Sequence, residues 1–72
     1  MLNLTNAAAA TIIREVSEGG IEPDWKAGID KILASCDAEP NSDFVLDSWS
    51  ISKMSGLDIH VCDMIANAIM MS

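Results

Sequence analysis

Three short stretches of the sequence carry residue types that could do chemistry, and the first is Ser50-Ile51-Ser52-Lys53. In this S-x-x-K spacing a lysine can help to activate a serine for acyl transfer. Enzymes that use the spacing need further motifs and a much longer chain than these 72 residues. Because a bare four-residue pattern is weak evidence, we expect that it arose by chance and that the protein is not an enzyme.

The second stretch places His60, Cys62 and Asp63 close together, and all three side chains can bind zinc. On a helix, however, His60 and Cys62 would point about 200° apart, because each residue advances the helix by about 100°. Cys36 could add a ligand, but a structural zinc site needs four ligands that converge. We therefore expect no metal site and no cofactor.

The third stretch, residues 37–47, is rich in side chains with oxygen atoms, as a calcium-binding loop is. An EF-hand loop also needs glycine at its sixth position and glutamate at its twelfth. Counted from residue 37, those positions hold Ser42 and Ser48, and Pro40 lies between the candidate ligands. A solvated loop that caps a helix explains the stretch better. Its candidate ligands are Asp37, Glu39, Asn41, Asp43 and Asp47.

The charge balance restricts the partners of this protein. There are eleven acidic residues and four basic ones, and the net charge is −7. Affinity for nucleic acid grows with the number of Lys and Arg that neutralise phosphates, and anionic lipids attract the same residues. We therefore expect neither direct nucleic-acid binding nor membrane docking. A basic protein partner fits the charge, although acidity also keeps a small apolar protein soluble.

Nothing in the sequence predicts export or membrane insertion. The N-terminal stretch has no basic residue before its apolar part, as a signal peptide would, and no apolar run reaches about 18 residues. We expect a cytoplasmic protein. Cys36 and Cys62 could in principle form a disulfide, but free buried thiols are the expected state in a reducing compartment.

Apolar periodicity and helix-end signals predict one all-α domain over residues 1–72. We expect a small bundle of about four helices, which homodimerisation could complete. The helices are predicted at residues 5–18, 23–37, 43–54 and 58–71.

The first two helices have clear boundaries in the sequence. Thr5 or Asn6 can cap the first helix, and Gly19-Gly20 can end it. Pro23 suits the first position of the second helix, and Pro40 prevents its continuation. The predicted buried faces are Ala8, Ala9, Ile12, Ile13 and Val16 in the first helix and Trp25, Ile29, Ile32, Leu33 and Cys36 in the second.

The segment 43–54 allows two interpretations. Ser42 is a suitable N-cap for a helix that breaks or bends around Ser48 to Ser52 and buries Val45, Leu46 and Trp49. The Phe, Val, Trp and Ile residues of the segment also favour a strand. No other segment offers itself as a pairing partner for a strand, so we predict the helix.

The last helix, predicted to begin with Asp58 as its N-cap, is apolar over most of its circumference. Such a helix must be buried on several sides, and a chain this short has a small core. Methionine adapts readily to irregular contacts. We therefore predict that part of this helix contacts another protein or a second copy of the chain. The predicted interface residues are Leu57, Val61, Met64, Ile65, Ile69, Met70 and Met71.

Residues 51–65 resemble the helix-turn-helix of Cro-type repressors. The matching positions are the apolar and small pair Ile51 and Ser52, the turn glycine Gly56, the following Leu57, and the buried Cys62 and Ile65. The resemblance implies a helical corner whose second helix would read DNA. The exposed positions of that helix carry Asp58, His60 and Asp63, and carboxylates there repel phosphates. We expect the corner without the DNA binding.

The expected function is that of a small acidic protein-binding module, an inhibitor or regulatory adaptor that sequesters or blocks its partner. Small acidic proteins of this kind are frequent among phage and mobile-element products, so a host regulator or a host defence or nucleic-acid enzyme is the expected partner. A homodimer is expected through the same surface. Two alternatives stay open: a nucleic-acid mimic whose carboxylates enter the groove of a DNA- or RNA-binding enzyme, and a structural subunit of a larger assembly.

Overall fold

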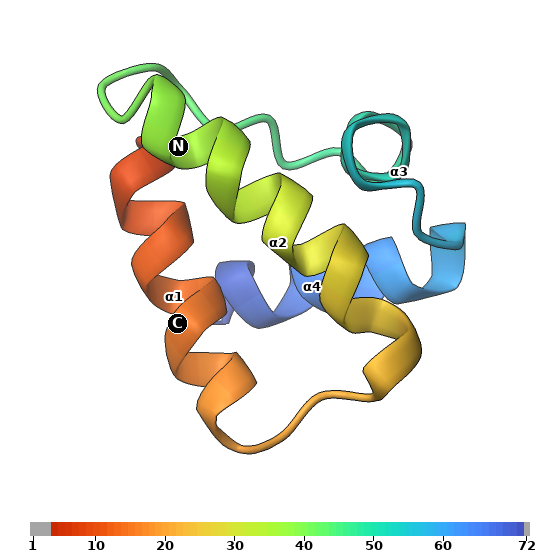
Figure 1. The fold of residues 1–72 in the computed structure, drawn as a ribbon. Helices are drawn as coiled ribbons and strands as arrows, with labels where there is room; N and C mark the ends of the chain where they lie inside the picture. Colours follow the sequence, from red (N-terminus) through yellow and green to blue (C-terminus); the bar gives the residue numbers. More distant parts are fainter. Residues whose placement is uncertain (1–3, 72) are drawn as a thin grey trace.

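A computed structural model of the chain, which describes residues 4–71, contains four helices arranged in a closed cycle. α1 packs on α2, α2 on α3, α3 on α4, and α4 returns to α1. In Figure 1, α1 and α2 spread apart toward the loop that joins them, and α4 crosses behind them. This arrangement is the small all-α bundle that the sequence predicts. The helices are α1 (Asn6–Glu18), α2 (Pro23–Ala38), α3 (Ser48–Ser55) and α4 (Ile59–Met70).

The ends of α1, α2 and α4 agree with the predicted ends to within about one residue. The Thr5 hydroxyl accepts a hydrogen bond from the Ala8 amide, which makes Thr5 the N-cap of α1. Pro23 takes the first position of α2, and Asp58 caps α4 through the His60 amide. Within residues 4–71 no helix is long and apolar enough to cross a membrane.

The segment before α3 differs from the prediction, because residues 43–47 are extended and α3 begins only at Ser48. The Phe44 amide donates to the Leu4 carbonyl, and Thr5 pairs with Asp43 in an isolated antiparallel bridge. This pairing holds the segment out of the helix, so Asp47 and not Ser42 becomes the N-cap of α3. The predicted bend within the helix is absent, since α3 is continuous through residues 48–55.

The side chains predicted to be buried by a helix at 43–54 are arranged differently as a result. Val45 is 55% exposed and Trp49 is 76% exposed, whereas Leu46 is half-buried. Phe44 is the residue of this segment that enters the core, at 6% exposure. An extended backbone sends alternate side chains to opposite sides, so Phe44 and Leu46 point inward while Val45 points to solvent.

The loop between α2 and α3 also completes the start of α1. The first amides of a helix have no partner within it. Here the Asn6 amide donates to the Ser42 carbonyl, and the Ala7 amide donates to the Pro40 carbonyl. The loop therefore ties the N-terminal end of α1 to the C-terminal end of α2.

All four helices and Phe44 contribute to the core. Ile32, Cys36, Ile51 and Cys62 are at most 1% exposed, and we call these four residues the closed side of the bundle. Gly28 lets α2 approach the α3–α4 connection closely, since a Cβ built there would lie only 2.4 Å from Leu57 Cγ. The predicted stripe of α2 is confirmed, with Trp25 and Leu33 half-buried at its edges.

The buried face of α1 is shifted from the predicted one. Ala9, Ala10 and Ile13 are buried, whereas Ala8 is exposed and Val16 is 52% exposed. Because α1 has to face both α2 and α4, its contact surface turns toward Ala10. Near its C-terminal end α1 separates from its neighbours, which leaves Val16 uncovered.

Candidate protein-docking groove

An apolar groove opens where α1 and α2 spread apart, with α4 as its third wall. Its volume is about 200 Å³. An apolar cavity of about 150 Å³ is large enough to hold a benzene molecule, so the groove can accept one aromatic or branched aliphatic side chain. Its lining residues come from three segments: Ile12, Ile13, Val16 and Ser17 of α1; Ile21, Trp25 and Ile29 of the loop and α2; and Val61, Met64, Ile65, Ala68 and Ile69 of α4.

The groove follows from how the helices are positioned around it. Gly19 and Gly20 separate α1 from α2, and Gly20 has a φ of 104° that other residues rarely adopt. The backbones of α2 and α4 do not pack against each other in the described part of the chain. Side chains alone must therefore fill the space between α1, α2 and α4, and they leave part of it open.

The groove wall is chemically uniform. The polar groups among the lining side chains are the indole N–H of Trp25 and the hydroxyl of Ser17, which donates to the Ile13 carbonyl at 2.7 Å. None of the lining residues can ionise at neutral pH. The groove therefore offers apolar area to a ligand and no group for acid–base or nucleophilic chemistry.

Two of its rim residues are large apolar side chains that remain mostly in solvent. Val16 on α1 is 52% exposed, and Met64 on α4 is 56% exposed. Burial of apolar surface yields about 25 cal/mol per Å². Because Val16 and Met64 stay exposed when the chain folds, a partner that covered both would gain the free energy of burying their apolar surface.

The predicted interface residues of the last helix are divided by the fold. Val61, Met64 and Ile65 line the groove, together with the buried Ile69 at its base. Leu57 is 9% exposed and belongs to the core contact with Gly28. Met70 and Met71 are 59% and 87% exposed but do not line the groove. The interface itself stays a prediction.

Sequence reasoning missed the walls that α1 and α2 contribute. Val16 and Trp25 were assigned to buried stripes, and Ile21 was assigned to no face. The available signal was the position of these residues beside the Gly19-Gly20 break, where two helices must separate. A break of this kind does not indicate how far the helices diverge.

The charged residues that adjoin the groove lining in the chain are mostly acidic. Glu15, Glu22 and Asp24 adjoin the lining residues Val16, Ile21 and Trp25 in the chain, and all three are exposed. We call them the acidic rim. Within residues 4–71 none of the three takes part in an ion pair.

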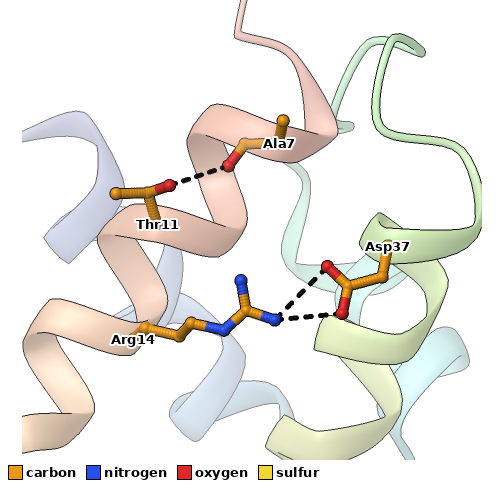
Figure 2. A network of polar contacts seen from close by, with 4 residues as sticks. All are labelled: Ala7, Thr11, Arg14 and Asp37. Atoms are coloured by element: carbon orange, nitrogen blue, oxygen red, sulfur yellow. Dashed lines mark hydrogen bonds and ion pairs between the residues drawn. The ribbon is translucent and has the colours of Figure 1, made fainter.

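The nearest cations serve contacts elsewhere. Arg14 donates to both carboxylate oxygens of Asp37, at 3.0 and 3.3 Å, and so connects α1 to α2 (Figure 2). Lys26 pairs with Asp30 at 3.4 Å on α2. Arg14 and Lys26 border a second, more open hollow between α1 and α2, and neither lines the apolar groove.

The other candidate chemistry in the sequence is dispersed in space. His60 is exposed, whereas Cys36 and Cys62 are buried free thiols. Burial raises the pKa of both thiols; nearby Asp37 adds to the effect at Cys36, and hydrogen bonds from serines oppose it at Cys62. A protonated, inaccessible thiol is a poor nucleophile. In the described part of the chain no three His, Cys, Asp or Glu side chains come together to hold a metal ion.

The α3–α4 corner turns at Gly56, the position of the turn glycine in the sequence resemblance. Gly56 adopts a left-handed conformation, with φ 76°, and its amide donates to the Ser52 carbonyl. Ser52 in turn donates its hydroxyl proton to the Leu57 carbonyl. Asp63, which would face DNA in such a unit, accepts a hydrogen bond from Ser48. The corner is thus a structural joint of the bundle.

Comparison with known proteins returned no match: no protein family, no curated protein and no solved structure resembles this chain. The apolar groove and its rim are therefore the observations from which a function has to be argued.

Proposed function

We propose that the protein is a small acidic protein-binding module, an inhibitor or adaptor that captures a partner in the apolar groove. The observation that carries the proposal is the groove itself, a continuous apolar wall built from three segments, with Val16 and Met64 more than half exposed at its rims. Exposed apolar surface that is concentrated in one concave place marks a contact site in small soluble proteins.

The rest of the surface supports this assignment. Four of the large apolar side chains exposed in residues 4–71 lie outside the groove lining: Val45 and Trp49 on or beside α3, and Met70 and Met71 at the end of α4. None of the four lines the concave site that α1, α2 and α4 build. Concave, fully desolvated pockets are where interface side chains contribute most to affinity.

A nucleic-acid mimic is the less supported function. Several carboxylates have structural partners: Asp47 and Asp58 cap helices, and Asp37 and Asp30 pair with Arg14 and Lys26. A mimic needs its carboxylates free and ordered along one face. Its complex would also be sensitive to salt over the whole interface, whereas an apolar contact persists at high salt.

The test is a matched pair of substitutions, Val16→Asp and Val45→Asp. The two valines are exposed to nearly the same extent, 52% and 55%, but only Val16 lines the groove. Each tagged variant is used to capture partners from cells that produce the protein, and circular dichroism verifies that both are folded. We expect the wild type and Val45→Asp to retain the same protein and Val16→Asp to lose it. Equal retention by both variants, or a wild type that is monomeric and retains nothing, would contradict the proposal.

A further inference from the structure

We infer that the occupant of the apolar groove is an amphipathic helix with Lys or Arg beside its apolar stripe. This inference rests on the proposed function and specifies the partner by its chemistry. It is carried by two independent features of the groove: a wall built almost wholly from helices, and the sign of the charged residues that adjoin the lining in the chain.

The wall offers an extended occupant few hydrogen-bonding partners. Apart from Ile21 in the α1–α2 loop, its lining residues lie in helices, which use most of their amides and carbonyls internally, and the Ser17 hydroxyl is already bonded to Ile13. A strand that entered the groove would leave its own amides without partners, at a cost of about 1–3 kcal/mol each. A helix satisfies its own backbone and can present an apolar stripe, at i, i+3 or i+4, and i+7, to the groove and its rims.

The volume of the groove limits how many side chains of the partner helix can insert. A volume of about 200 Å³ accommodates one large side chain. We therefore expect one aromatic or leucine anchor in the groove, with apolar neighbours one turn away that cover Val16 on one rim and Met64 on the other. In this arrangement the partner helix contacts α1, α2 and α4 together. The residues beside its apolar stripe then lie next to the acidic rim.

The acidic rim determines the sign of those flanking residues. Glu15, Glu22 and Asp24 are exposed, and among residues 4–71 they have no cationic partner. Opposite charges across an interface accelerate encounter and exclude like-charged competitors. A second copy of this chain would bring a net charge of −7 and its own acidic rim against the same place, which disfavours a symmetric dimer through the groove.

A direct test uses Trp25, which lines the groove and is half-buried, as the reporter. The chain has two tryptophans, so Trp49→Phe leaves Trp25 as the only one. The probes are two synthetic helical peptides of about 15 residues with the same leucine stripe, one with Lys and the other with Glu beside it. We expect the Lys peptide to change Trp25 emission and to bind at least about tenfold more tightly than the Glu peptide. Added salt should weaken the Lys complex.

Matched neutral variants identify which carboxylates are responsible. Glu15→Gln/Asp24→Asn removes two charges at the rim, and Glu39→Gln/Asp43→Asn removes the same two residue types from the α2–α3 loop at the other end of α1. We expect the rim pair to lose most of the preference for Lys over Glu and most of the salt dependence. The loop pair should keep both.

Other outcomes separate the inference from the proposed function. Equal binding of both peptides, abolished by Met64→Asp, would retain the groove as a docking site and overturn the basic partner. If neither peptide bound and the solution mass showed a dimer that Met64→Asp dissociates, the occupant would be a second copy. If neither peptide bound and the protein were monomeric, the inference would be overturned, while the capture experiment with Val16→Asp would still decide the proposed function.

Discussion

The closed side of the bundle and the apolar groove are both apolar, but they differ in how completely the chain covers them. Ile32, Cys36, Ile51 and Cys62 are at most 1% exposed, whereas Val16 and Met64 at the groove are more than half exposed. The closed side comes from α2, α3 and α4, where α2 and α4 each pack on α3 and Gly28 lies against Leu57 of the α3–α4 connection. The difference fits the proposed division of roles, in which the closed side maintains the fold and the groove binds a partner.

The largest expected effect compares the same substitution on the two sides. Ile51→Ala should lower the free energy of unfolding by about 2–5 kcal/mol, because it leaves a cavity in a fully packed region. Ile65→Ala should cost less than half as much, because Ile65 is half-buried and already borders open space. Urea denaturation followed by circular dichroism measures both.

Ile51→Val, with an expected loss of about 0.5–1.5 kcal/mol, keeps the first comparison measurable if Ile51→Ala does not fold. Equal losses for the Ala variants at positions 51 and 65 would mean that the groove is packed as tightly as the closed side. The proposed docking site would then lose its structural basis.

The next effect concerns the close contact that seals the closed side. Gly28→Ala places a Cβ within 2.4–2.9 Å of three Leu57 side-chain atoms. Overpacking of this kind costs about 1–3 kcal/mol, while alanine gains about 1 kcal/mol over glycine within a helix. We expect a net destabilisation of about 1 kcal/mol, measured by urea denaturation.

A double-mutant cycle with Leu57→Ala checks the cause of that loss. Removal of the Leu57 side chain makes room for the Cβ, so Gly28→Ala should become neutral or stabilising in the Leu57→Ala background. An unchanged cost in that background would indicate that the close approach of Leu57 is not what requires glycine at position 28.

The sequence predicted the fold well wherever the determining contacts are local. α1, α2 and α4 were identified by apolar spacing and by their end residues Thr5, Pro23 and Asp58, and the structure confirms all three ends. The predicted start of α3 is wrong because the Phe44 amide pairs with the Leu4 carbonyl, which lies near the N-terminus and far from Phe44 in the sequence. Local patterns around Ser42 contain no information about that partner.

The groove could be predicted only in part for a related reason. The excess of apolar residues on α4 indicated a contact surface, and Val61, Met64 and Ile65 do line the groove. The walls from α1 and α2 depend on the angle between helices, which no single segment specifies. Val16 has the periodicity of a core residue, and only the divergence of α1 from α2 and α4 exposes it.

Two glycines at helix ends provide a smaller comparison of the two regions. Gly56, in the α3–α4 corner, has φ 76°, so Gly56→Ala should cost about 1–2 kcal/mol. Gly19, beside the groove, has φ −72°, and a Cβ there would make only an ordinary contact at 3.6 Å. Gly19→Ala should therefore be neutral or stabilising by about 0.4–1 kcal/mol, as measured by thermal or urea denaturation. Destabilisation by both variants to the same extent would indicate that the α1–α2 loop is as constrained as the corner.

The smallest expected effect is a pH dependence of stability that arises on the closed side and not in the groove. Cys36 and Cys62 both belong to the closed side, and burial raises the pKa of each thiol in the folded state. As the pH rises, each thiol therefore stays protonated to a higher pH in the folded protein than in the unfolded one. Its contribution to stability is therefore complete below the unfolded pKa of about 8.5 and is lost as the pH rises through the higher folded value.

Stability should consequently decline above about pH 8.5 under reducing conditions, before lysines titrate near pH 10.4; the chain has no tyrosine to obscure the effect. Denaturation midpoints across this range should fall more steeply for the wild type than for Cys36→Ala/Cys62→Ala. The variant is expected to be less stable at neutral pH, because it lacks two buried side-chain groups of the core. Its stability should nevertheless change less with pH than that of the wild type. Parallel profiles would assign the alkaline loss to other groups. Peptide binding in the groove, whose lining contains no thiol, should stay constant over the same range while the protein remains folded, because only the closed side carries these titrating groups.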